Sequence, residues 1–249
     1  PPEFLLTHPV TESRVADAAG RAEQYPRKPR LTSLEFLILK QGAMRRYQLD
    51  ESEVGQYLQE IRSRNPRGSG DFAAASYNLA SLALEQKKPD EARKYLDDII
   101  SPWNQHAAVS ALDTRVTAAQ GDTEKAIITL DKALTYAPQN LVLLTTKASI
   151  LDDHDESARA VRVLQNLCDK RPTTPWLWQR LAEAAEHAQM KLTSFRANGE
   201  YLFFSGQQAR ALRQMELALQ EAKKAGDFQQ ESIISQRLRI MAASLSQLQ

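Results

Sequence analysis

The segment Glu124-Lys-Ala-Ile-Ile-Thr-Leu130 has one counterpart thirty-four residues before it and another thirty-four residues after it. The counterparts are Asp90-Glu-Ala-Arg-Lys-Tyr-Leu96 and Ala158-Arg-Ala-Val-Arg-Val-Leu164. Each segment places a leucine four positions after an alanine, so both side chains lie on one face of a helix. The alanine lets a neighbouring helix approach closely, and the leucine fills the groove behind it. Pro138 and Pro172 follow at the same step, and each ends its helix.

This pattern resembles the tetratricopeptide repeat, whose period is thirty-four residues. Residues 73–103, 107–140 and 141–174 form three units in register, and a fourth begins near Pro175. The resemblance implies an all-α fold, a tetratricopeptide-repeat α-solenoid in which antiparallel helix pairs stack into a right-handed superhelix. Two details depart from the pattern. Asp113 and Thr114 occupy positions where leucine and a small residue are usual, and Asp155 stands where a glycine is expected between two helices.

The composition supports the helical prediction and excludes other classes. The 249 residues include 34 alanines but only 8 valines and 10 isoleucines, so β-branched residues are scarce. The net charge is +1, which excludes a general basic field that would attract nucleic acid. No apolar run approaches the roughly 18 residues that a membrane span requires. The single cysteine, Cys168, excludes an intrachain disulfide and a zinc site built from cysteines.

Three regions follow from these signals. Residues 1–30 precede the array and end in a basic, proline-rich linker; residues 31–70 form two degenerate N-terminal helices, expected at 34–47 and 52–63. Residues 71–249 form the array with its C-terminal capping helices, which we expect at 195–204, 207–225 and 228–248 without a firm repeat boundary. The chain opens with Pro1-Pro2, and we interpret it as a piece of a longer protein.

The N-terminal segment Thr7-His8-Pro9, followed at the matching spacing by Arg14, is unlike a repeat unit. It resembles the end of the protease domain in bacterial periplasmic HEXXH zinc metallopeptidases, the beta-barrel assembly-enhancing protease-like family, which carry C-terminal tetratricopeptide repeats. The resemblance implies that residues 1–30 are the C-terminal remnant of a metallopeptidase domain plus the linker, with a short helix at residues 15–24. The resemblance implies that His8 lies near the zinc of the parent enzyme, where it could act as an extra ligand, and that Arg14 supports the site. The alternative is that both residues only fasten the last loop of that domain.

The chain itself contains no HEXXH motif, so we expect it to be inactive alone and to carry no cofactor, with zinc belonging to the full-length parent. His106, His154 and His187 lie on separate units and do not predict a shared metal site. We interpret Cys168 as a small hydrophobic residue that is buried in the core. Glu183 and Glu186 are neighbours on a helix, as paired carboxylates for acid–base catalysis could be, but the sequence shows no residue that would form a cleft with them.

The concave groove is the expected binding site. In this repeat the side chains at positions two, five, nine and twelve of each first helix face inward. These positions hold Ala74, Tyr77, Ser81, Leu84, Ala108, Ala111, Arg115, Ala118, Val142, Thr145, Ser149, Asp152, Trp176, Gln179, Glu183 and Glu186. We take six as candidate groove residues: Tyr77, Ser81, Arg115, Thr145, Trp176 and Gln179. The clamp that grips C-terminal carboxylates in chaperone-binding repeats is missing, so we expect an extended or helical protein segment with Tyr77 and Trp176 as anchors.

Together these observations predict a protein-binding module of a periplasmic zinc metallopeptidase involved in outer-membrane protein quality control. Its expected partners are misfolded or assembling outer-membrane proteins, the assembly machinery and the parent protease domain, with no nucleic acid and no membrane span. A standalone tetratricopeptide scaffold with no attached protease is the alternative. An enzyme contained within these 249 residues has the least support.

Overall fold

The computed structural model describes residues 12–25, 32–47 and 51–246, and these residues contain helices and no strand. The all-α prediction is therefore confirmed. The chain divides into two compact units, one within residues 1–33 and the other within residues 34–249. The first unit holds α1 (Glu12–Glu23), which overlaps the helix predicted at 15–24, and its described side chains are exposed.

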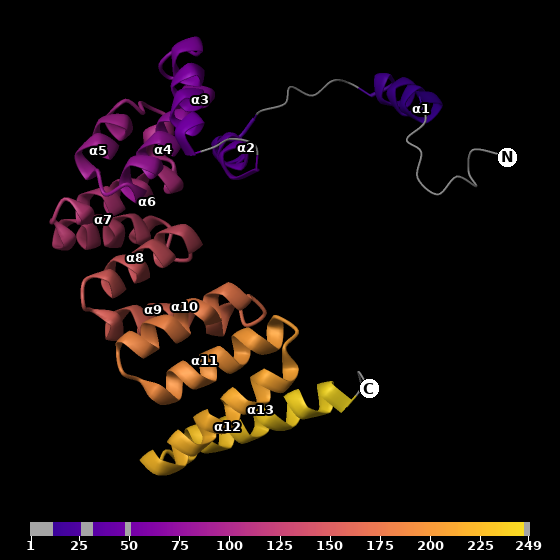
Figure 1. Cartoon of the computed structure of the whole chain (residues 1–249), viewed down its shortest axis with the longest axis vertical. Helices are drawn as coiled ribbons and strands as arrows, with labels where there is room; N and C mark the ends of the chain where they lie inside the picture. Colours follow the sequence, from indigo (N-terminus) through magenta and orange to yellow (C-terminus); the bar gives the residue numbers. More distant parts are fainter. Residues whose placement is uncertain (1–11, 26–31, 48–50, 247–249) are drawn as a thin grey trace. The chain divides into compact units, whose positions relative to one another are not determined.

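The second unit consists of helix pairs that stack in chain order, from α2 and α3 at one end to α12 and α13 at the other (Figure 1). The first helices of the pairs are α2 (Leu34–Tyr47), α4 (Gly70–Glu85), α6 (Ala107–Ala119), α8 (Leu141–Asp153), α10 (Pro175–His187) and α12 (Gln208–Ala225). The second helices are α3 (Glu51–Arg64), α5 (Pro89–Asp97), α7 (Thr123–Tyr136), α9 (Ser157–Lys170), α11 (Lys191–Phe204) and α13 (Phe228–Ser246). A short 3-10 turn, η2 (Trp103–Gln105), precedes α6.

The repeating alanines and leucines form the core of this stack. Ala92, Ala126 and Ala160 are each 0% exposed, which confirms that they lie where helices approach closely. The leucines four positions later are also buried. These side chains belong to continuous clusters that run from one pair to the next, so each pair covers the apolar face of its neighbour.

The turns inside four of the pairs each use one left-handed residue at the same repeat position. Lys87, Gly121, Asp155 and Gln189 have φ values of 59°, 95°, 60° and 57°, and they recur every thirty-four residues. The next backbone amide in each turn donates a hydrogen bond of 2.8–3.2 Å to the carbonyl five residues earlier, as in a Schellman cap. Asp155 therefore takes the conformation of the missing glycine, and the helix still ends at the expected place.

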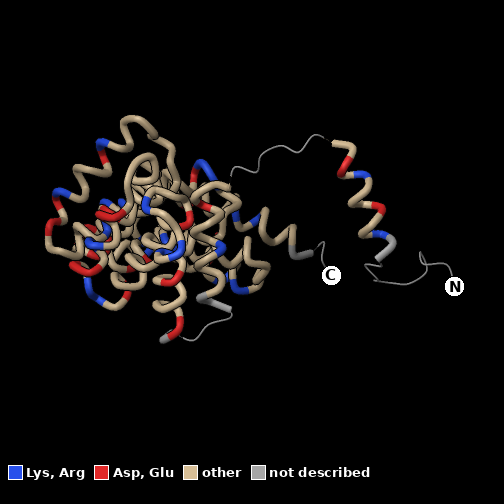
Figure 2. The backbone as a smooth tube through the Cα atoms, turned by 90° about the horizontal axis from the view of Figure 1, so that it is seen from above, with Lys and Arg blue, Asp and Glu red and all other residues tan. Residues whose placement is uncertain are grey.

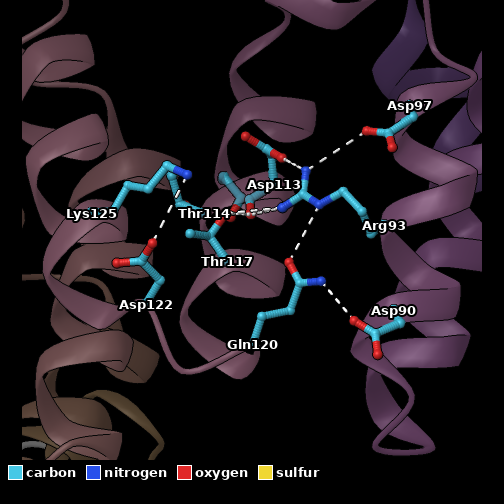
Figure 3. A network of polar contacts seen from close by, with 10 residues as sticks. Asp90, Arg93, Asp97, Asp113, Thr114, Thr117, Gln120, Asp122 and Lys125 are labelled. Atoms are coloured by element: carbon cyan, nitrogen blue, oxygen red, sulfur yellow. Dashed lines mark hydrogen bonds and ion pairs between the residues drawn. The ribbon is translucent and has the colours of Figure 1, made fainter.

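The unusual second unit is explained by a polar contact between α5 and α6 (Figure 3). Arg93 forms an ion pair with Asp113 and donates a hydrogen bond of 2.9 Å to Thr117 Oγ1. Thr114, which is 2% exposed, donates its hydroxyl hydrogen to the Ala111 carbonyl at 2.8 Å. Asp113 thus adds a charged link between the two pairs beside the apolar cluster that they share.

The C-terminal part differs from the sequence prediction in one boundary. The helix expected to begin at Phe195 begins at Lys191, as α11. The helices expected at 207–225 and 228–248 are α12 and α13, and they form a further pair. Positive and negative side chains are interspersed along the helices of the second unit, as Figure 2 shows, in line with the balanced charge of the sequence.

Candidate peptide-binding groove

Side chains from three successive first helices meet in one pocket. Leu84 of α4, Arg115 and Ala118 of α6, and Ser149 of α8 line a cavity of about 150 Å³. All four occupy positions that the repeat pattern predicts to face inward. Four further residues complete the lining: Ala119, Ile150, Asp153 and His154. The structure thus brings the inner faces of α4, α6 and α8 together as a common surface.

A row of polar side chains connects this pocket to the neighbouring helices. Burial raises the pKa of the Tyr77 phenol, and the positive charge of Arg115 partly opposes that rise. On the other side, Arg180 of α10 donates a hydrogen bond to Ser149 Oγ. Tyr77, Arg115, Ser149 and Arg180, which we call the central row, therefore cross four helices in sequence.

The two tryptophans of α10 have different environments. Trp178 is 4% exposed, and its indole nitrogen donates a hydrogen bond of 2.7 Å to the Pro172 carbonyl, so it packs between units. Trp176 is 43% exposed and remains available for a ligand. Gln179 is exposed on the same helix, and its amide donates to Glu183 at 3.0 Å.

Val142, another predicted inward position, is 45% exposed, whereas four other positions contribute less to an open surface. Ser81 and Thr145 are half-buried, and the Thr145 hydroxyl donates to the Leu141 carbonyl at 2.8 Å within its own helix. Ala74 and Ala111 are buried and serve packing between helices. The repeat pattern therefore identifies the correct helices, but not every inward position reaches the surface.

The repeat pattern did not predict two residues that lie at the groove. Arg180 lies one position after Gln179, outside the four inward positions, yet its long side chain reaches back to α8. His154 directly follows α8 and lines the pocket, while its Nδ1 donates to the Ile150 carbonyl at 2.8 Å. Position alone could not reveal either residue, since side-chain length and helix ends decide both placements.

A second cavity of about 580 Å³ lies between the end of α10, α11 and α12. Phe195 and Leu217 supply apolar surface, and Glu221 contacts Lys224 at 2.6 Å. The hydrogen bond from Lys224 lowers the pKa of Glu221. This cavity was not predicted, because the repeat register after residue 190 could not be assigned from the sequence.

The histidines are held in separate places. His106 Nε2 lies 2.7 Å from Glu35 Oε1 and its Nδ1 accepts the Ala108 amide, whereas His187 pairs with Asp152 at 3.1 Å. Within the described part of the chain, no group of three or more His, Cys, Asp or Glu side chains could hold a metal ion. The residues present there do not fit a zinc site.

Cys168 is fully buried, in agreement with its interpretation as a small core residue. Burial raises the pKa of its thiol to about 12, which keeps the sulfur protonated near neutral pH. Glu183 and Glu186 are both exposed on α10.

The predicted protease-domain remnant is only partly described. His8 lies outside the described residues. Arg14 is exposed on α1. Among the described helices, none combines the length and apolar character that crossing a bilayer requires.

Comparison with known proteins supports the family resemblance. The chain is 28% identical over 213 residues to the Beta-barrel assembly-enhancing protease of Yersinia pestis and 28% identical over 231 residues to that of Escherichia coli K12. These matches cover 85% and 92% of this chain but 43% and 46% of the relatives. The chain therefore spans less than half the length of these proteases. No family model matches the sequence.

Solved structures share the fold. The structure of PilW, described as a widely conserved type IV pilus biogenesis factor, gives a TM-score of 0.53 at 15% identity over 83% of this chain and 92% of its own. A tetratricopeptide repeat protein from Parabacteroides merdae gives 0.50 at 13% identity over 92% and 90%. At such low identity the likeness concerns the fold alone, and it confirms the tetratricopeptide-repeat solenoid.

Proposed function

We propose that this homologue of the beta-barrel assembly-enhancing proteases binds protein clients or assembly partners for a periplasmic zinc metallopeptidase in outer-membrane protein quality control. A tetratricopeptide solenoid is a protein-interaction module, and the homology covers most of the chain. The observation that carries the proposal is the pocket that α4, α6 and α8 line with inward-facing residues, together with the exposed Trp176 on α10 and Tyr77, which lies near Arg115 of that pocket. The homology favours this function over a scaffold with no attached protease.

The described residues supply binding rather than hydrolysis in this proposal. They offer no metal-ligand cluster, so the zinc chemistry would belong to another part of a longer protein. His8 and Arg14 would lie close to that active site. If His8 is an additional zinc ligand, His8→Ala in the full-length protein changes both its zinc content and its proteolytic rate. Unchanged zinc content and rate would rule out the ligand role.

The binding function can be tested with a urea-denatured outer-membrane β-barrel protein diluted into buffer with the chain. We expect Tyr77→Ala combined with Trp176→Ala to weaken capture by about tenfold, because buried aromatic anchors dominate protein interfaces. The matched control is Tyr136→Ala combined with Phe228→Ala. These aromatic side chains are 89% and 81% exposed on α7 and α13, away from the central pocket.

Circular dichroism should show the same helical content in both double variants and in the wild-type chain. Capture that is reduced only by the groove variant supports the proposal. Equal capture by both variants would place the binding surface elsewhere, and no capture by the wild-type chain would overturn the client-binding function.

A further inference from the structure

The cavity of about 580 Å³ beside α11 and α12, which we call the α11–α12 cavity, is elongated along these two neighbouring helices (Figure 1). On α11 its lining runs from Lys191 to Asn198, and on α12 it runs from Gln214 to Lys224. At a rise of about 1.5 Å per residue, these stretches are about 10 and 15 Å long. An extended chain rises about 3.3 Å per residue, so the cavity can hold roughly three to five residues of such a chain.

Two half-buried carboxamides in this cavity, those of Asn198 and Gln214, have no hydrogen-bond partner among the described residues. The three other half-buried asparagines in the described part of the chain each have one. Asn65 and Asn78 donate to main-chain carbonyls, and Asn140 caps α8. The carboxamides of the α11–α12 cavity therefore keep their hydrogen-bonding capacity for a ligand.

The charged side chains that line the cavity balance one another. Glu186 and Glu221 are acidic, and Lys191 and Lys224 are basic. The hydrogen bond from Lys224 lowers the pKa of Glu221, and the charge of Lys191 acts in the same direction, so both cations lie near this carboxylate. The lining therefore has no net charge and favours a ligand that is itself uncharged.

Extending the proposed function and resting on it, we propose that the α11–α12 cavity binds an uncharged, extended segment of a protein partner through its main chain. A carboxamide has an acceptor oxygen and two donor hydrogens, so it can pair with both the C=O and the N–H of a peptide chain. A helical segment uses these groups internally, and only an extended segment offers them.

Apolar surface in the cavity would fix the register of the bound segment. Phe195 of α11 is half-buried, and Leu217 of α12 is 37% exposed. Alternate residues of an extended chain point to the same side. One apolar side chain can therefore rest against Phe195 and Leu217 while the main chain on either side reaches the carboxamides.

The inference can be tested by fluorescence anisotropy with a labelled peptide of sequence Ser-Thr-Ser-Leu-Ser-Thr-Ser and blocked ends. One control peptide has ester bonds in place of the amides on either side of the leucine, and another has glycine in place of the leucine. We expect each control to bind about fivefold to tenfold more weakly, because one lacks main-chain donors and the other lacks the apolar side chain. Added salt should leave binding unchanged, and replacing two serines by aspartates or by lysines should not strengthen it.

Variants of the chain identify the site. Asn198→Leu combined with Gln214→Met removes both carboxamides at similar side-chain size and should weaken peptide binding by about tenfold. Asn166→Leu combined with Gln236→Met is the matched control, because these residues are exposed on α9 and α13 and do not line the cavity. If circular dichroism shows that the first pair perturbs folding, Asn198→Asp combined with Gln214→Glu keeps the polarity, removes the donors and should also weaken binding.

Capture of the denatured β-barrel protein, measured on the same variants, separates this inference from the proposed function. Client capture by a wild-type chain that does not bind the uncharged peptide would overturn the inference and leave the proposed function standing. Equal binding of the ester peptide, tighter binding of a charged peptide, or equal loss in the control variant would also overturn it. Failure of the wild-type chain to bind either probe would overturn both proposals.

Discussion

Arg237 of α13 holds Glu200 of α11 through two hydrogen bonds, from Nε to Oε1 at 2.8 Å and from Nη2 to Oε2 at 2.7 Å. The Glu200 side chain is 7% exposed, so its charge depends on this partner. The guanidinium also lies over the rings of Phe203 and Phe204, at 4.8 and 5.6 Å from their centroids. These two half-buried phenylalanines therefore contact the same arginine that links α13 to α11.

Replacing Arg237 with alanine should lower the free energy of unfolding by about 3–5 kcal/mol, because it leaves the Glu200 carboxylate buried without a counter-charge. Urea denaturation followed by circular dichroism measures this change. Arg239→Ala is the matched control: it removes an exposed arginine of the same helix and should change stability by less than about 0.5 kcal/mol. Similar losses for both variants would show that the buried pair does not stabilise the end of the array.

The contact between His187 and Asp152 predicts a pH dependence within the groove. The hydrogen bond to Asp152, followed by the charge of that carboxylate, raises the pKa of His187 above its ordinary value, and Glu186 and Glu183 act in the same direction. A raised pKa in the folded state means that the protonated ring is favoured by folding. The stabilisation is therefore complete below the unfolded pKa of about 6.5 and is lost as the pH rises through the folded value.

Asp152→Asn should return the His187 titration midpoint toward its ordinary value, as followed by NMR of the histidine ring. The stability difference from wild type should be largest near about pH 5.5 and smallest above the folded pKa. Asp153→Asn is the control, since Asp153 is the adjacent carboxylate and forms no ion pair with His187 among the described contacts. An unchanged midpoint in Asp152→Asn would contradict the assigned cause.

The sequence predicted the fold best where the repeat supplies its own core residues. Ala92, Ala126 and Ala160 mark α5, α7 and α9 because close helix packing requires a small residue there. The next members of the two columns are Ser194 and Asn198, so the signal disappears in α11. Other residues of α11, including Ala197 and Leu202, pack into the core instead.

Gly199 shows why the lost signal did not mean a lost helix. A Cβ atom at this position would lie 2.9 Å from Met215 Cγ, so the absence of a side chain lets α11 approach α12. Close packing is achieved here by a glycine in a different register. A search for alanine at a fixed period cannot detect this glycine, although it also allows two helices to pack closely.

The groove could be predicted as a face but not as a set of contacts. The period identified α4, α6, α8 and α10, and the structure places Arg115 and Ser149 at one pocket. The repeat period could not identify Arg180, because the long side chain of this residue crosses from α10 to α8. The periodic pattern fixes where a Cβ points, whereas the guanidinium lies several bonds farther away.

The left-handed turn residues give a prediction in which two similar substitutions have opposite effects. Gly121 has a φ of 95° in a turn, whereas Gly55 lies within the helix α3. A Cβ atom added at either position would meet nothing within 4 Å. Gly121→Ala should therefore lower the free energy of unfolding by about 1 kcal/mol, because only the backbone conformation is strained. Gly55→Ala should raise it by about 0.5–1 kcal/mol through helix propensity.

Gln189→Gly tests the same turn from the opposite direction. Gln189 has a φ of 57° and follows α10 at the position equivalent to Gly121, so glycine should relieve the strain of a left-handed side chain. Because glycine also makes the unfolded chain more flexible, the expected gain is smaller, a few tenths of a kcal/mol. Urea denaturation of the three variants provides the comparison. Destabilisation by both alanine substitutions, or none by Gly121→Ala, would show that the left-handed conformation does not limit these turns.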